Sequence, residues 1–495
     1  MGKKHFLVLL LIICLGVILR LYQLGGRDFW YDEAWKLISS RDLYTSYLDH
    51  RPLFNFLLHF WQKISPQNEF SLRLLPALFS ILTIPVFFLL SRELMPPAPS
   101  LWATFLLSVS PLQVWYAQEL RAYSLIAFLV VLTVYLFLKA IKEGRKFWVA
   151  FTISSILTFY TSYITLFLLI PEAVYLYYYH PRESRKWLLA TLISIFFFSL
   201  RYYSFLYQFV FFTQSFWTVP PTAKDFFISL ENFNLGYNAT PFAFHFSLLL
   251  SLPLIVFAFK YKPREKRDFA LIFFLFPYSF AFLFSFLLPV FITRQLFAFS
   301  ALYLLFLSLG LPLFLKKKLF FALYMIFWVS LASVSLFCHY SDIMPSPLPY
   351  HSGTYPKKPF KPLAEFLRRN FKKGDLIAHT NPGTVTPLLY YLGPGEYSQR
   401  YFIIPSYQDE YWRRNILEWK VPENLSIPVI PPVDLSRKEN LPYKRVWLVS
   451  SDWARDWNID LHSRRVREWL GNRYRLVEEK WLDGVSVSLF VKKRQ

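Results

Sequence analysis

Long apolar segments, separated by short polar loops, recur through most of this sequence. About eleven of them approach the length of roughly 20 residues that a helix needs to cross the hydrocarbon core of a bilayer. They cover residues 5–21, 72–91, 100–116, 121–140, 147–163, 164–180, 187–205, 243–260, 268–290, 295–315 and 319–338. Hydrophobic side chains make up 55% of the chain, more than a soluble protein of this length uses. We therefore predict a polytopic α-helical membrane protein with about 11 transmembrane helices.

The basic residues predict how these helices are oriented. The formal net charge is +22, but Lys and Arg occur in short runs between apolar segments, so the pattern does not indicate nucleic-acid binding. An N-terminus inside the cell places the main runs on one side of the membrane, as the positive-inside rule requires. These runs are Lys3 with Lys4, Arg92, Lys142 with Arg145 and Lys146, Arg182 with Arg185 and Lys186, Lys262 to Arg267, and Lys316 to Lys318. An odd number of spans then places the C-terminus outside.

The character of the sequence changes near residue 340. Residues 1–340 form the predicted transmembrane domain, and the Pro-rich stretch 341–362 is typical of a linker. Residues 363–495 are more polar and predict a small extracytoplasmic α/β domain. Within it we expect helices at 363–373, 385–392 and 463–470, strands at 375–378, 401–404 and 445–450, and a hairpin of 474–481 with 485–491.

Two adjacent carboxylates, Asp32 and Glu33, follow the first apolar segment. They lie in the loop 22–71, which the predicted topology places outside the cell. Carboxylates at a membrane surface are costly to desolvate, and packing does not explain a pair of them. One interpretation is a catalytic role, and the other is an acidic first turn of a helix.

Further polar residues occur in loops on the same predicted side. Glu119, Arg121 and Tyr123 lie between the third and fourth spans, and Arg294 lies between the ninth and tenth. Arg51 precedes a predicted interfacial helix in the loop 22–71. On a continuous helix Glu119 and Tyr123 would share a face and Arg121 would not. An ion pair of Glu119 with Arg121, and an Arg294 that reaches to lipid headgroups, are the structural alternatives.

Four short motifs together resemble one family. They are Arg-Asp-Phe-Trp-Tyr-Asp-Glu-Ala-Trp (27–35), Arg-Pro-Leu (51–53), Gln-Glu-Leu-Arg-Ala-Tyr (118–123) and Phe-Ile-Thr-Arg-Gln (291–295). In order and position they resemble the C superfamily of glycosyltransferases, in the group of the protein O-mannosyltransferases and the bacterial lipid A aminoarabinose transferases. The resemblance covers roughly residues 1–340 as an arrangement, and the tail is similar to the variable outer domain of bacterial members.

This resemblance implies an inverting transfer of a sugar from a polyprenyl-phosphate donor to an acceptor hydroxyl or phosphate group at the outer face of the plasma (inner) membrane. Asp32 matches the position of the base, and Glu33 would orient the base or the acceptor. Phosphate leaves without a general acid but needs nearby cations, for which Arg121 and Arg294 are the candidates and Arg51 a third.

The remaining expectations concern partners and cofactors. Glu119 and Tyr123 would complete the substrate site. The partners would be the lipid-linked donor, membrane lipids, and an acceptor that is a lipid, a glycan or a protein. The sequence requires no cofactor and leaves a divalent metal open. An oligosaccharide transferase or ligase that uses a lipid-linked donor is an alternative, and a lipid-linked sugar transporter or flippase is an alternative of a different class.

Overall fold

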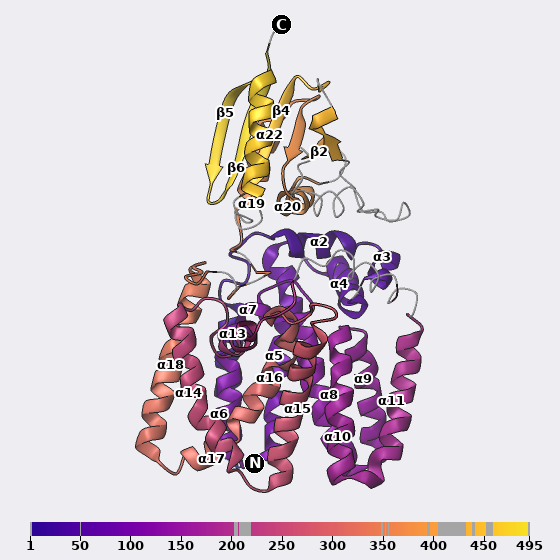
Figure 1. Cartoon of the computed structure of the whole chain (residues 1–495), viewed down its shortest axis with the longest axis vertical. Helices are drawn as coiled ribbons and strands as arrows, with labels where there is room; N and C mark the ends of the chain where they lie inside the picture. The colour runs from indigo at the N-terminus through magenta and orange to yellow at the C-terminus, as the bar shows by residue number, and fades with distance from the viewer. Residues whose placement is uncertain are drawn as a thin grey trace.

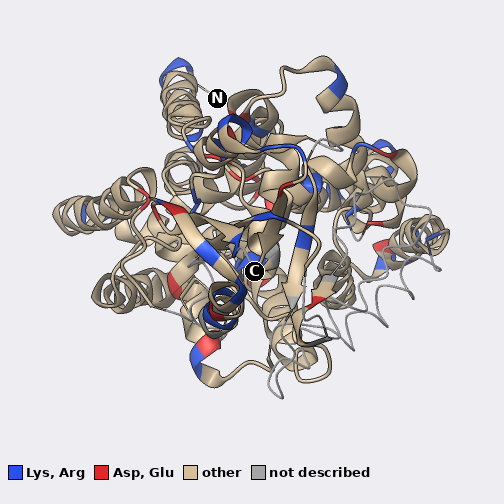
Figure 2. Ribbon diagram, turned by 90° about the horizontal axis from the view of Figure 1, so that it is seen from above, with Lys and Arg blue, Asp and Glu red and all other residues tan. Residues whose placement is uncertain are grey.

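A computed structural model describes residues 2–49, 51–201, 206, 219–347, 350–351, 353–354, 356–393, 397–403, 432–437, 441–451 and 459–493. The chain forms a bundle of helices with a smaller α/β part stacked on one end of it (Figure 1). The N-terminus lies at the opposite end of the bundle. Seen along the long axis, the C-terminus lies over the middle of the bundle (Figure 2).

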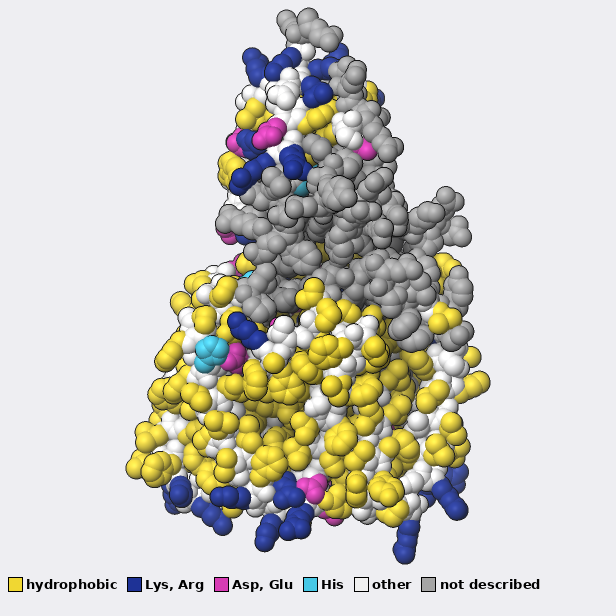
Figure 3. Space-filling model, in the orientation of Figure 1, with side chains coloured by type: hydrophobic (Ala, Val, Ile, Leu, Met, Phe, Trp, Pro, Cys, Tyr) yellow, Lys and Arg dark blue, Asp and Glu magenta, His cyan; other side chains and the backbone are white. Residues whose placement is uncertain are grey.

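Among the described residues, seven helical segments are long and apolar enough to cross a membrane. They are α1 (Lys3–Leu21), α5 (Glu69–Leu94), α8 (Tyr123–Glu143), α14 (Pro241–Phe259), α15 (Arg264–Phe284), Thr293–Phe314, which comprises α16 (Thr293–Ser308) and α17 (Leu311–Phe314), and α18 (Lys318–Tyr340). Their outer surface carries a broad belt of exposed apolar side chains (Figure 3). Such a belt is what a hydrocarbon solvent requires.

Four of the predicted spans are shorter or broken in the structure. Segment 100–116 divides into α6 (Pro97–Ser108) and α7 (Pro111–Ala117), because Pro111 begins a new helix rather than continuing the old one. Segments 147–163 and 164–180 become α9 (Arg145–Phe159), η1 (Tyr163–Leu168) and α10 (Leu169–Tyr179). Segment 187–205 becomes α11 (Ser184–Ser199), and part of its end lies outside the described residues. A short η2 (Pro181–Glu183) precedes it.

Four short helices lie at the end of the bundle that meets the α/β part (Figure 1). They are α2 (Tyr31–Ser39), α3 (Leu43–Leu48), α4 (Pro52–Ile64) and α13 (Ala223–Leu235). Local chemistry explains where they begin: the Asp42 side chain caps α3, Pro52 occupies the first turn of α4, and a capping box of Thr222 with Asp225 begins α13. This layer carries the acidic pair predicted to be functional.

The α/β part contains one mixed sheet of six strands in the order β3-β2-β1-β4-β6-β5. Its elements are α19 (Phe360–Asn370), β1 (Leu376–His379), α20 (Pro382–Leu392), β2 (Gln399–Ile403), β3 (Pro432–Asp434), η3 (Leu435–Arg437), β4 (Arg445–Ser451), α22 (Ile459–Arg473), β5 (Tyr474–Leu482) and β6 (Val485–Lys492). β1, β2, β3 and β4 are parallel, and the hairpin of β5 and β6 is antiparallel, as its sequence predicted. The predicted residue Ile404 lies outside the described residues.

Helix α20 joins the two parts of the molecule. The Tyr391 hydroxyl accepts a hydrogen bond from the Phe29 backbone N–H (2.8 Å) and donates one to the Glu69 carboxylate (2.9 Å). The Thr386 hydroxyl donates to the backbone carbonyl of Tyr31 (3.1 Å), at the first residue of α2. The α/β part therefore holds the start of the helix that bears Asp32 and Glu33.

Candidate active site

Asp32 lies between two arginines that come from distant parts of the chain. Its Oδ2 atom is 3.5 Å from Nη2 of Arg121 and 3.4 Å from Nη1 of Arg294. Arg121 also donates to the backbone carbonyl of Asp32 (3.3 Å). The Asp32 side chain retains 17% exposure, whereas Glu33 beside it is fully buried. Of the acidic pair, Asp32 is thus the one that a ligand can approach.

The loop 118–122 explains how Arg121 reaches Asp32. α7 ends at Ala117 and α8 begins at Tyr123, so the intervening residues form a buried turn rather than one continuous helix. The expectation that Glu119 and Tyr123 share a helical face is therefore wrong. The Gln118 amide secures the turn by donating to the carbonyls of Arg20 (3.0 Å) and Tyr22 (2.7 Å). Because the helix is interrupted here, the Arg121 side chain can point toward the acidic pair.

Arg51 joins this group from the start of α4. Its guanidinium lies 4.4 Å from the ring centre of Tyr123, and its Nη2 donates to Oε1 of Gln295 (2.9 Å). The Arg51 side chain is buried, yet its Nε and Nη1 atoms contact no hydrogen-bond partner among the described residues. The same holds for Nε of Arg121. Buried charged donors without partners are costly, so this is a place where an anionic ligand would be favoured.

A second ion pair, between Lys36 and Asp49, lies beside Arg51. Sequence reasoning did not predict it. Lys36 lies one turn after Asp32 on α2, and its Nζ is 2.6 Å from Oδ2 of Asp49. Asp49 also accepts the Arg51 backbone N–H at its other oxygen (2.8 Å). Burial lowers the pKa of Lys36 to about 8, against the attraction of Asp49. The buried cations of Arg51, Arg121 and Lys36, together with the half-buried Arg294, thus lie near the carboxylates of Asp32 and Asp49.

Glu33 faces away from this group and is enclosed by donors. Arg73 of α5 binds both of its oxygens, through Nε and Nη2, each at 2.8 Å. Lys357 Nζ lies 3.1 Å from Oε2, and the Leu120 backbone N–H donates to Oε1 at 2.8 Å. Burial alone would raise the pKa of Glu33, but Arg73 and Lys357 outweigh it and lower the pKa to about 2. Glu33 therefore remains an anion that fixes α2 in place.

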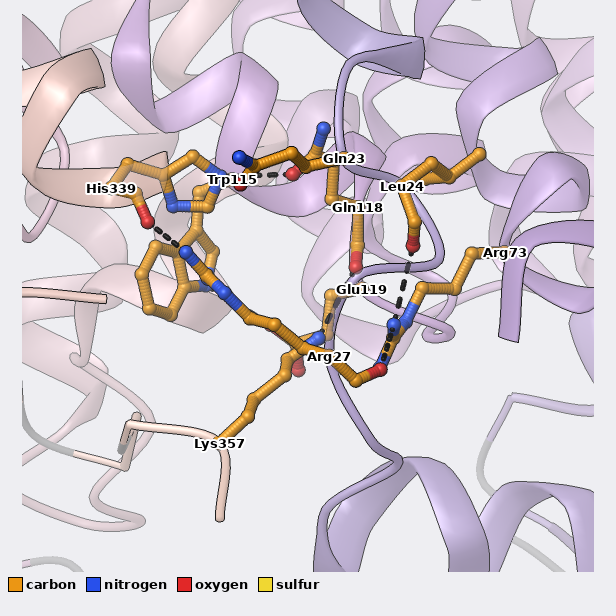
Figure 4. A pocket seen from close by; sticks show the side chains of 9 residues that line it. All are labelled: Gln23, Leu24, Arg27, Arg73, Trp115, Gln118, Glu119, His339 and Lys357. Carbon is orange, nitrogen blue, oxygen red and sulfur yellow. Dashed lines mark hydrogen bonds between the residues drawn. The ribbon is translucent and has the colours of Figure 1, made fainter. Parts of the chain in front are cut away.

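Glu119 lines a small polar cavity beside Glu33 (Figure 4). Side chains of the loop after α1, α5, the α7 to α8 turn, α18 and the linker converge there: Gln23, Leu24, Arg27, Arg73, Trp115, Gln118, Glu119, His339 and Lys357. The Trp115 indole N–H donates to Glu119 (3.1 Å). Burial raises the pKa of Glu119 to about 7, although Lys357 acts in the opposite direction. Glu119 can therefore gain or lose a proton near neutral pH.

The structure thus divides the predicted site residues into two groups. Asp32, Arg51, Arg121, Tyr123 and Arg294 come together, whereas Glu119 lines the adjoining cavity and Glu33 pairs with Arg73 and Lys357, which also line it.

Sequence reasoning missed four residues of this region: Lys36, Asp49, Arg73 and Lys357. Arg73 carried a signal, because a cation within an apolar span needs a partner. Lys36 carried a weaker one, since it is a helical turn from Asp32. The sequence around Asp49 and Lys357 gave no signal that would distinguish them from other charged residues in loops.

No group of three or more His, Cys, Asp or Glu side chains suited to hold a metal ion occurs in the described part of the chain. The carboxylates of Asp32 and Glu33, which are adjacent in the sequence, are each paired with cations of the protein. Their present partners are therefore Arg and Lys groups.

Comparisons with known proteins bear on the family and the fold of this chain. Residues 49–203 match the sequence model of the family described as dolichyl-phosphate-mannose-protein mannosyltransferase. The sequence has no significant match among curated proteins. The family match over residues 49–203 and the fold shared with the crystal structures below agree with the resemblance seen in the sequence, and the apolar helices agree with the predicted mostly helical membrane protein.

The particular structures that it resembles include ArnT from Cupriavidus metallidurans. The apo crystal structure of ArnT is 12% identical, covers 97% of this chain and 97% of its own, and has a TM-score of 0.63. The structure of ArnT bound to undecaprenyl phosphate has the same identity and TM-score and covers 99% and 98%. The Archaeoglobus fulgidus oligosaccharyltransferase tethered with an acceptor peptide is 13% identical, covers 100% of this chain and 74% of its own, and has a TM-score of 0.50.

Proposed function

We propose that the chain is an inverting glycosyltransferase that moves a sugar from a polyprenyl-phosphate donor to an acceptor hydroxyl or phosphate group at the outer face of the membrane. The observation that carries this proposal is the carboxylate of Asp32 set between Arg121 and Arg294, beside the unpartnered buried donors of Arg51. A base and a phosphate-binding set of cations are the two things that this reaction needs.

In the proposed reaction the acceptor oxygen attacks the anomeric carbon from the face opposite the phosphate. A new C–O bond forms, the bond from carbon to the phosphate oxygen breaks, and its electron pair leaves with the phosphate. Asp32 takes the proton of an acceptor hydroxyl. Arg51, Arg121 and Arg294 offset the charge that grows on the leaving polyprenyl phosphate, and the planar guanidinium suits its oxygens.

The donor phosphate also gives the arginines a new partner. Arg121 and Arg294 both lie at the long end of ion-pair distances from Asp32, 3.5 and 3.4 Å, so neither is tightly held by it. When a phosphate binds, the two guanidinium groups turn toward it and leave the carboxylate to the acceptor. Tyr123, under Arg51, would form one wall of this phosphate site.

Glu33 and Glu119 have supporting roles in this proposal. The Glu33 carboxylate is already saturated by Arg73, Lys357 and the Leu120 N–H, so it orients the base through α2. Glu119 shapes the adjoining cavity and sets the position of the turn that carries Arg121.

The same proposal includes the orientation in the plasma (inner) membrane. Eleven spans, an inside N-terminus and an outside C-terminus would place the α/β part and Asp32 on the extracytoplasmic face. Lys and Arg side chains gather at the end of the bundle farthest from the α/β part (Figure 3), which is the pattern of a cytoplasmic face. Labelling of single cysteines introduced at Lys317 and at Lys373, in a variant whose Cys14 and Cys338 are replaced by Ser, tests it in intact cells: only the second should react with an impermeant reagent.

The decisive experiment on function uses Asp32→Asn in purified full-length protein. Synthetic undecaprenyl-phosphate-linked hexoses and pentoses are offered with lipid, glycan and peptide acceptors, and released undecaprenyl phosphate is measured. Wild type should release it with at least one pair, and Asp32→Asn should lose release while keeping its thermal unfolding midpoint and its binding of undecaprenyl phosphate. Asp42→Asn is the matched control, because asparagine caps α3 as well as aspartate does. Full release by Asp32→Asn would remove Asp32 as the base.

A further inference from the structure

The segment that connects α18 to the α/β part runs across the candidate active site. We call residues 350–361 the strap; all of them except 352 and 355 are described. The carbonyl of Gly353 accepts a hydrogen bond from Nη1 of Arg294 (3.0 Å). Four residues later, Lys357 Nζ lies 3.1 Å from Glu33 and donates to the carbonyl of Gln118 (3.2 Å). The strap therefore touches both the cation beside Asp32 and the carboxylate next to it in sequence.

Both ends of the strap are attached to the membrane part. At its start, the Asn232 side chain of α13 donates to the Tyr350 carbonyl (2.8 Å), and the Tyr350 ring stacks on Phe244 with 4.8 Å between ring centres. At its end, the backbone N–H of Lys361 donates to the Asp28 carboxylate (2.8 Å). The path of the chain between these points, and with it Lys357, is thereby set independently of the sheet.

Lys357 is unusually buried for a lysine, because only 8% of its side chain is exposed. The charged groups that face it are Arg73, Glu33, Glu119 and Arg27. Burial lowers the pKa of Lys357 to about 8, and the two carboxylates oppose that shift. A buried lysine that served packing alone would be replaced by an apolar side chain without loss. Its contacts with the turn that carries Arg121 and with Glu33 give it a specific task.

We propose that Lys357 is a positioning residue for the transfer reaction. It acts through Glu33 and the Gln118 carbonyl to hold the side chains of Asp32 and Arg121 in their positions relative to one another. This inference depends on the proposed function. Glu33 precedes the second turn of the α2 helix and adjoins Asp32, and Gln118 precedes Arg121 by three residues, so one ammonium group ties together the two segments that form the Asp32 to Arg121 ion pair. Arg73 also binds Glu33, and the Leu120 backbone N–H of the turn donates to Glu33 directly, so Lys357 adds a second link between α2 and the turn.

The test compares Lys357→Met, Lys357→Gln and Lys357→Arg in the full-length protein. Lys357→Met keeps most of the length and removes the charge, and Lys357→Arg restores a charge. The control is Lys373→Met, an exposed lysine in the turn before β1. Each protein is assayed for its thermal unfolding midpoint, for binding of undecaprenyl phosphate by native mass spectrometry, and for kcat and KM of undecaprenyl phosphate release from the donor that wild type uses.

We expect Lys357→Met and Lys357→Gln to lower kcat by about 10- to 100-fold, the cost of a misplaced reacting group. KM and undecaprenyl phosphate binding should stay within about threefold of wild type, because the arginines remain. Lys357→Arg should recover most of kcat, and Lys373→Met should match wild type.

Three outcomes would overturn the inference. If wild type is active and Lys357→Met keeps kcat within twofold, the positioning role fails while the proposed function stands. If both uncharged variants unfold, or lose undecaprenyl phosphate binding in step with kcat, Lys357 has a structural or binding role instead. If wild type releases no undecaprenyl phosphate from any donor offered, the proposed function fails and the role of Lys357 fails with it.

Discussion

The carboxylate of Glu33 and the guanidinium of Arg73 form a two-pronged ion pair, with both N to O distances at 2.8 Å, deep between α2 and α5. The Arg73 side chain also donates to the backbone carbonyls of Leu24 (3.2 Å), Arg27 (2.6 Å) and Asp28 (3.0 Å). The Arg73 side chain thus fixes both Glu33 and the backbone that leads into α2, the helix that bears Asp32.

Replacement of Arg73 should be the most destabilising single change at this site. In Arg73→Met, Glu33 would stay buried with only part of its compensation, and such losses cost about 3 to 5 kcal/mol. The thermal unfolding midpoint in detergent should fall clearly below that of wild type. The double variant Glu33→Gln with Arg73→Met should lose less than the sum of the two single variants. Additive losses would mean that the two side chains do not act as a pair.

The same pair predicts a response to acid. The pKa of Glu33 in the folded protein, about 2, is below its ordinary value of 4.5, so the unfolded state binds more protons between these values. The stability that Glu33 contributes is therefore complete above about pH 4.5 and is lost as the pH falls toward 2. Unfolding midpoints between pH 3 and pH 6 should decline more steeply for wild type than for Glu33→Gln. Parallel curves would contradict this assignment.

Glu119 should make the stability of the protein depend on pH in the opposite direction. Its pKa in the folded protein, about 7, is above the ordinary 4.5, so the unfolded state loses the proton first as the pH rises. Wild type should therefore lose stability between about pH 4.5 and pH 7 through this group, whereas Glu119→Gln should not. The difference in unfolding midpoint between the variant and wild type should move in favour of the variant from pH 5 to pH 7.5. A difference that stays constant would show that Glu119 is ionised throughout.

Arg51 should matter for the donor more than for the fold. Its two unpartnered nitrogens are available to a phosphate, and a charged hydrogen bond is worth about 1.5 to 3 kcal/mol. Arg51→Met should therefore weaken undecaprenyl phosphate binding by about tenfold or more. Arg475→Met, an exposed arginine of β5, is the control and should bind as wild type does. Equal affinity of wild type and Arg51→Met would place the phosphate elsewhere.

We also expect the reaction to proceed without an added metal ion, because cations of the protein itself face Asp32. Release of undecaprenyl phosphate should be unchanged after EDTA treatment and after addition of Mg²⁺, Mn²⁺ or Zn²⁺. Loss with EDTA and recovery with one of these ions would instead favour the metal-assisted mechanism of an oligosaccharide transferase.

Sequence reasoning found the helical membrane character and much of the cluster around Asp32, because hydropathy and the alternation of basic loops depend on short stretches of chain. It also brought Arg121 and Arg294 to the same predicted side. It could not show how the turn at 118–122 is held, because the bonds that stabilise this buried turn run from Gln118 to the distant carbonyls of Arg20 and Tyr22. For the same reason, sequence reasoning could not predict the partners of Glu33, which come from distant parts of the chain.

The strap also sets the order in which the site can be assembled. α2 and the turn at 118–122 are made early in synthesis, but Lys357 follows the last of the helices able to cross the membrane. A growing chain thus holds Asp32 and its arginines before it has the lysine that holds them in register, and before α20 exists to grip the start of α2. A chain that lacked the strap would therefore carry Asp32, Arg121 and Arg294 without the contacts of Lys357 to Glu33 and to the Gln118 carbonyl.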